Sequence, residues 1–134
     1  MKLTVPTKGH SDFVDITDRV AAAVEQSGIT AGAAVVFVPG STAALTTMEY
    51  EEGSVEDVKA VLEKLAPEDA DYQHHRRWGD RNGAAHIKSA LIGADLVIPI
   101  EHGKLALGTW QQIVLIDFDE RARQRDVIVK LMKG

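Results

Sequence analysis

The chain has 134 residues, of which 45% are hydrophobic and 26% charged, and these values predict a single globular domain spanning residues 1–134. Its formal net charge of −5 argues against a nucleic-acid partner, because contact with a phosphate backbone needs a basic surface. The sequence contains no cysteine, which excludes disulfides, thiolate metal ligands and a nucleophilic thiol.

The first residues lack the apolar core of a secretory signal, and no later segment has the length of a membrane-spanning helix. We therefore expect a soluble, cytoplasmic protein without a membrane partner.

Residues 16–28 are predicted to form the first helix, because apolar residues recur there every four positions. Thr17 is expected to cap this helix and Gly28 to end it. Residues 31–39 form a short apolar run that is rich in β-branched residues, which predicts a buried strand.

Residues 54–67 are predicted to form a second amphipathic helix. Ser54 and Asp57 resemble a capping box at its start, and Pro67 ends it. The following residues, 67–85, are polar and have no clear period, so we expect a long irregular segment, a place where functional residues are often found.

The last third of the sequence has the pattern of strands. Residues 95–101 and 104–119 flank a turn at His102 and Gly103, and residues 125–132 alternate in the manner of a strand. We interpret this region as an antiparallel meander. The predicted fold class is α+β, a predominantly antiparallel β-sandwich with two amphipathic helices.

Asp80, Asn82 and His86 lie close together in the sequence, just before an apolar segment. A carboxylate and an imidazole in this arrangement can bind a divalent cation, or act as a general base with its orienting partner. The simpler alternative is that Asp80 or Asn82 caps a turn and that His86 makes one hydrogen bond in the core.

Three of the five histidines fall within residues 74–86. If the chain is extended there, either His74 or His75 faces inward with His86 while the other faces solvent. His10 and His102 are assigned to surface or turn positions. Arg76 and Arg77 can bind an anionic substrate or belong to a solvated charged face.

Residues 40–42 are Gly, Ser and Thr and follow the predicted strand. The hydroxyl groups of Ser41 and Thr42 can hold a phosphate, or serve as ordinary turn residues. Glu49 is predicted to be either an exposed residue or a carboxylate of the site, because its burial without a partner would be costly.

Residues 108–111, Gly-Thr-Trp-Gln, are predicted to lie within a long strand. Thr109 and Gln111 would then share one face and could contact a ligand, and Trp110 is expected in the core.

Residues 41–50, 79–93 and 102–119 together resemble the YjbQ family, also called UPF0047, and the likeness extends over nearly the whole chain. The resemblance implies a compact α+β fold and a homotrimer with sites near subunit boundaries. It also implies an enzyme of the transferase class, a secondary thiamine-phosphate synthase. Such an enzyme joins hydroxymethylpyrimidine diphosphate to a thiazole phosphate and releases pyrophosphate, usually with Mg²⁺.

The family's polar cluster falls on residues of this chain that the preceding patterns also select. The expected catalytic residues are His86, Asp80, Asn82 and Glu49. The expected residues for a phosphorylated small molecule are Ser41, Thr42, Thr109, Gln111 and Arg77. The expected ligands of Mg²⁺, or of Zn²⁺ as the alternative metal, are His75, His86 and Asp80. Many family members have His where this chain has Gly40, so one imidazole of the family pattern is missing.

Two other functions fit the same residues. One is a trimeric metal- or small-ligand-binding protein without turnover, and the other is a metal-assisted hydrolase.

Overall fold

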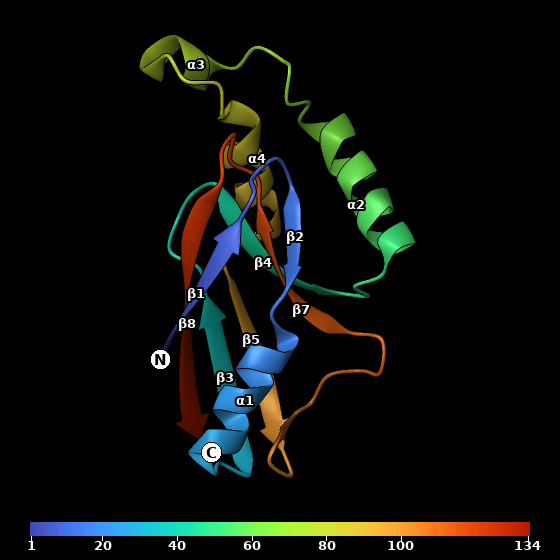
Figure 1. Ribbon diagram of the computed structural model, residues 1–134, viewed down its shortest axis with the longest axis vertical. Helices are drawn as coiled ribbons and strands as arrows, with labels where there is room; N and C mark the ends of the chain where they lie inside the picture. Colours follow the sequence, from blue (N-terminus) through green and yellow to red (C-terminus); the bar gives the residue numbers. More distant parts are fainter.

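The computed structural model describes residues 1–134 and contains two antiparallel sheets and four helices (Figure 1). The larger sheet has the strand order β1 (Lys2–Thr7), β8 (Arg123–Lys133), β3 (Ala31–Phe37), β5 (Asp95–Glu101), β6 (Lys104–Leu105). The smaller sheet has the order β2 (Asp12–Asp15), β7 (Gln112–Asp117), β4 (Ala43–Met48). The helices are α1 (Thr17–Ser27), α2 (Glu52–Leu65), α3 (Gln73–Trp78) and α4 (Gly83–Ile92). The predicted α+β class with antiparallel sheets is confirmed.

The two sheets pack face to face around one large apolar cluster, which contains Val36 and Val129 of the larger sheet and Leu45 and Leu115 of the smaller one. A second cluster joins the opposite face of the smaller sheet to α2 and α4. The smaller sheet is therefore buried on both faces. This explains why β7 is a continuous apolar run rather than an alternating one.

The first helix is confirmed with nearly the predicted bounds, and Gly28 ends it in a left-handed conformation at φ 72°. Its predicted cap is wrong. Thr17 is already the first helical residue, and its backbone N–H donates to the Asp15 carboxylate at 2.9 Å. The Thr17 hydroxyl group instead donates to Asp15 and accepts from the backbone N–H of Ile113, which ties α1 to β7.

The second helix begins two residues earlier than predicted, and its cap is Glu51 rather than Ser54. The Glu51 carboxylate accepts from the backbone N–H groups of Gly53 and Ser54 at 2.7 and 2.9 Å. The expected irregular segment, 67–85, contains the short helix α3, which buries none of its residues and so has no apolar period to reveal it.

The predicted meander is wrong. β5 and β6 form a hairpin around His102 and Gly103, but β7 crosses to the smaller sheet and β8 inserts between β1 and β3. Residues 108–111 lie in the loop before β7 rather than in a strand. Trp110 is 73% exposed instead of lying in the core.

No helix of the structure combines the length and apolar character needed to span a membrane. The cytoplasmic location stays a prediction.

Candidate functional site

The candidate site lies where α3, the start of α4 and the segment leading into β4 meet. α3 supplies His74, the connection between α3 and α4 supplies Asp80 and Asn82, and the first turn of α4 supplies His86. The structure thus brings together the three residues that the sequence had grouped by their spacing, and it adds His74.

His74 occupies the centre of this group. Its Nδ1 lies 3.1 Å from Oδ1 of Asp80, and its ring centroid lies 4.4 Å from that of His86. The two atoms of the first contact are at ion-pair distance but are not aligned as a hydrogen bond, so each remains without a hydrogen-bond partner. Asn82 Oδ1 is also unpartnered. Buried polar atoms that lack partners are typical of sites that a ligand completes.

His75 has a structural contact instead. Its Nε2 accepts a hydrogen bond from the backbone N–H of Gly83 at 3.0 Å, and its ring packs edge-on against Tyr72. Both histidines lie in a helix and not in an extended chain, so the expected alternation of the two side chains is wrong. The imidazole that faces His86 belongs to His74.

The pKa of His86 is lowered from the ordinary value of 6.5. Burial of the ring is the main cause, followed by the neighbouring His74. The carboxylates of Asp119 and Asp80 and the backbone carbonyl group of Ser41 act in the opposite direction but do not outweigh these two. His86 is therefore a neutral imidazole at pH 7, the form that accepts a proton.

A buried polar network lies directly behind the site and was not predicted from the sequence. Its charged members Asp117, Asp119 and Arg125 are 0%, 3% and 5% exposed. Thr42 accepts a hydrogen bond from Arg125 at 2.8 Å and donates one to Asp119 at 2.9 Å, while Asn82 donates to Asp119 at 3.4 Å. The sequence did contain a signal, since acids and an arginine in apolar strand runs must be paired when buried.

This network changes the expectations for the hydroxyl pair. The single proton of the Thr42 hydroxyl group is donated to Asp119, so this group has no donor left for a phosphate. Ser41 is exposed, and its hydroxyl group makes no hydrogen bond within the chain. Of the two, Ser41 remains available to a ligand. Arg77 is exposed on α3 and has no carboxylate partner.

Gly40 precedes this hydroxyl pair at φ 147°, and a Cβ atom there would lie 3.0 Å from Nη1 of Arg125. A histidine at this position would be strained in its backbone and crowded by the Arg125 side chain. The local structure is therefore built for glycine.

A preformed metal site is not present in the arrangement. No three His, Asp or Glu side chains come close enough together to hold one ion. Of the expected ligand set, His75 already uses Nε2 as an acceptor, while Asp80 and His86 both lie next to His74. These side chains do not fit a closed metal cage as they stand, and Mg²⁺ or Zn²⁺ stays a prediction.

Glu49, Thr109 and Gln111 lie in a different place. Glu49 follows the last residue of β4, whereas Ser41 and Thr42 precede its first, so the length of the strand, ~20 Å, separates them. Gln111 donates to the Thr47 hydroxyl group at 3.0 Å. The expected cluster is thus split within one chain. A cavity of about 440 Å³ at the second location is lined by Asp15, Thr17, Asp18, Glu49, Tyr50, Glu51, Thr109, Trp110 and Gln112.

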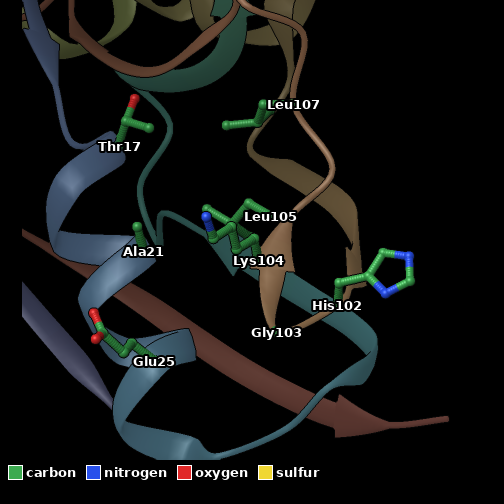
Figure 2. Close-up of a pocket in the computed structure, with 8 residues that line it drawn as sticks. All are labelled: Thr17, Ala21, Glu25, His102, Gly103, Lys104, Leu105 and Leu107. Atoms are coloured by element: carbon green, nitrogen blue, oxygen red, sulfur yellow. The ribbon is translucent and has the colours of Figure 1, made fainter.

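A further cavity of about 430 Å³ lies between α1 and the β5–β6 hairpin (Figure 2). Lys104 is directed toward α1, while the His102 ring turns away from the helix. His102 is exposed at φ 52° and His10 at φ 54°, which confirms that both are turn residues. None of the predicted site residues lines this cavity.

Comparison with known proteins identifies the family. The family model described as "UPF0047 protein YjbQ-like" matches residues 1–134. The chain belongs to the YjbQ-like UPF0047 family. A UPF0047 protein of Archaeoglobus fulgidus is 43% identical over 132 residues, covering 98% of this chain and 100% of the relative. The UPF0047 protein YugU of Bacillus subtilis is 34% identical over 97% of this chain and 96% of its own length.

Solved structures of UPF0047 relatives share the fold. A YbjQ-like protein of unknown function from Sulfolobus solfataricus matches with a TM-score of 0.93 and 34% identity, covering 100% of this chain and 96% of the other. An uncharacterised UPF0047 protein from Clostridium acetobutylicum matches with a TM-score of 0.89 and 39% identity, covering 98% and 99% of the two chains.

The expectation of thiamine-phosphate synthesis is wrong on these comparisons. The relatives carry only the UPF0047 name, the structural neighbours are described as uncharacterised or of unknown function, and nothing in either set indicates that activity. The family is shown, but its name specifies no reaction.

Proposed function

We propose that the protein is an enzyme that transfers a proton to or from a small phosphorylated substrate, with His86 as the proton-transfer group. The observation that carries the proposal is the group of His86, His74 and Asp80, in which the pKa of His86 is lowered by burial and the neighbouring side chains hold unpartnered polar atoms. A neutral imidazole beside a second imidazole and a carboxylate is an arrangement suited to general acid–base chemistry.

The phosphate group would be held at the same end of the molecule. Ala84 and Ala85 are buried at the start of α4, where the first backbone N–H groups of a helix lack intrahelical partners. The exposed Ser41 hydroxyl group and the Arg77 guanidinium group lie on the segments that flank this end. Such donors are suited to an anionic group at a helix start.

We also propose that the protein assembles as a homotrimer, in which Glu49 and Thr109 of one copy approach His86 of the next. Two features support this arrangement. The acidic cavity beside Glu49 and the basic residues of α3 have complementary charges. Trp78, next to the site, and Trp110, next to the cavity, are 71% and 73% exposed in the single chain.

Sedimentation analysis tests the assembly. We expect a mass of three 14.5 kDa chains for the wild type and a smaller species for Trp110→Ser. A single-chain mass for the wild type at micromolar concentration would contradict the trimer.

Phosphorus NMR tests the enzymatic proposal. The protein is incubated with a panel of sugar phosphates, nucleotides and organic diphosphates, and His86→Gln is compared with His102→Asn, a control at an exposed turn. We expect turnover of at least one compound, reduced about 10²- to 10⁴-fold in His86→Gln and unchanged in His102→Asn. Turnover that is unaffected by His86→Gln, or tight binding without any turnover, would overturn the proposal.

Mg²⁺ and Zn²⁺ are tested separately. Metal analysis of protein purified without an affinity tag, and the same incubations with EDTA, show whether an ion takes part. An unchanged rate in EDTA would remove the metal from the reaction.

A further inference from the structure

The carboxylate of Asp119 contacts both segments that flank His86. It lies just after β7 and is 3% exposed. Oδ2 accepts hydrogen bonds from the Thr42 hydroxyl group at 2.9 Å and from Arg123 Nη1 at 2.8 Å. Oδ1 accepts from the Asn82 side chain at 3.4 Å and from the backbone N–H of Glu120 at 2.8 Å. One buried group therefore reaches the residue before β4 and the residue before α4.

The contacts behind Asp119 fix its orientation. Arg125 donates to Asp117 through Nε at 2.8 Å and Nη2 at 2.9 Å, and the same Nη2 donates to the Thr42 hydroxyl group at 2.8 Å. Because Thr42 accepts from Arg125, its single proton points to Asp119. The donor and acceptor in each hydrogen bond of the series Asp117–Arg125–Thr42–Asp119 are thus fixed by the charged groups in it.

We propose that Asp119 is a positioning residue of the site. Its carboxylate holds Asn82 and Thr42 in one arrangement on the two sides of His86, and its negative charge favours the protonated ring that forms during proton transfer. The inference rests on the proposed function only in taking His86 as the proton-transfer group. The sequence patterns and the family likeness selected Asn82 and Thr42 but not Asp119.

The surroundings of His86 show why this carboxylate matters. The charged or titratable groups that face the ring are His74 from α3, Asp80 from the connection between α3 and α4, and Asp119 from the end of β7. Asp80 is half-exposed and lies next to His74, so its charge is screened by solvent and acts on His74 as well as on His86. Asp119 is buried, so solvent screens its charge little, and Arg123 neutralises only part of that charge.

The test uses NMR of the purified protein and needs no substrate. In Asp119→Asn, we expect the side-chain amide resonances of Asn82 to move, because their charged acceptor is gone. The titration midpoint of the His86 ring should fall, because a negative charge that favours the protonated ring is removed. The matched control is Thr7→Val, which removes the 2.6 Å hydrogen bond to Asp117 in the same network but contacts neither Asn82 nor His86.

A purely structural role predicts the opposite pattern. If Asp119→Asn lowers the unfolding free energy as Thr7→Val does, yet leaves the Asn82 amide and the His86 midpoint at their wild-type values, the inference is overturned.

A second variant covers the case in which Asp119→Asn does not fold. Arg123→Gln removes the partly exposed cation from Asp119 and leaves Arg125 in place. The His86 midpoint should then rise, since less of the Asp119 charge is neutralised. A midpoint that is unchanged or lower would contradict the inference. Because these measurements need no turnover, failure of the enzymatic proposal would be seen separately in the phosphorus NMR experiment.

Discussion

Arg125 and Asp117 form a two-point ion pair between the two sheets, with Nε 2.8 Å from one carboxylate oxygen and Nη2 2.9 Å from the other. Asp117 belongs to β7 of the smaller sheet and Arg125 to β8 of the larger one. Burial raises the pKa of the Asp117 carboxyl group, but the hydrogen bonds from Arg125 and Thr7 outweigh it and hold the pKa below its ordinary value. The pair is thus charged, buried and fully bonded.

Arg125→Met should destabilise the protein strongly, because it leaves the Asp117 carboxylate buried without its cation. We expect a loss of about 3–5 kcal/mol in the unfolding free energy. Arg123→Met is the control, since its side chain is partly exposed, and should lose about 1 kcal/mol. Urea unfolding of both variants measures the difference. Equal losses in unfolding free energy would show that the buried Arg125–Asp117 pair contributes no more to stability than the partly exposed Arg123.

Lys88 and Glu63 should respond unequally to substitution. The Lys88 side chain is 5% exposed, and its ammonium group has one carboxylate partner, Glu63 on α2, at 3.0 Å. Glu63→Gln should lose about 1 kcal/mol, because a buried ammonium group keeps only a neutral partner. Lys88→Met should be neutral or stabilising, since it removes the buried charge and keeps the volume. Thermal or urea unfolding measures the stability of both variants, and a larger loss of stability for Lys88→Met than for Glu63→Gln would refute this explanation.

The lowered pKa of His86 predicts a pH dependence of stability. The unfolded chain binds a proton near pH 6.5, whereas folded His86 binds it only at lower pH. The unfolding free energy therefore falls as the pH drops below 6.5, until the folded-state pKa is reached. In His86→Gln this part of the dependence disappears. Urea unfolding at about pH 8 and pH 5.5 measures it as the difference between wild type and variant. An equal change in unfolding free energy between the two pH values for wild type and His86→Gln would be evidence against the lowered pKa of His86.

Gly83→Ala should displace α3 from α4. A Cβ atom at this position would lie 2.8 Å from the Tyr72 Cβ atom and 2.9 Å from His75 Nε2, distances that real Cβ atoms do not tolerate. Since α3 buries none of its residues, stability should change little while α3 loses its contact. Hydrogen exchange should increase in residues 73–79, compared with Ala90→Ser at an exposed position of α4. Unchanged exchange would mean that the helices adjust without separating.

The parts of the fold that could be predicted are those with a regular apolar pattern. α1, α2, β3, β5 and β8 each bury one face or both, so their spacing showed them. β1 alternates equally well in burial but was not predicted. Pro6 within it is tolerated because β1 is at the edge of its sheet, where a missing N–H group leaves no ladder bond broken. β4 opens with two alanines, and α3 buries nothing, so neither gave a signal.

The same distinction applies to the candidate site. Asp80, Asn82 and His86 are neighbours in sequence, so their proximity followed from spacing. Asp119 approaches Asn82 only because β7 and α4 pack together, and this contact across 37 positions has no local signature. Glu49 shows the converse case. It was grouped with the site by resemblance, while the direction of β4 carries it away from His86.

The position of β8 has a consequence for the synthesis of the protein. β8 is the last element of the chain, yet it lies between β1 and β3, and β1 pairs with no other strand. During synthesis, β1 therefore has no strand partner until residues 123–133 have left the ribosome. The larger sheet can close only by joining residues more than 120 positions apart, such as Lys2 and Ile128.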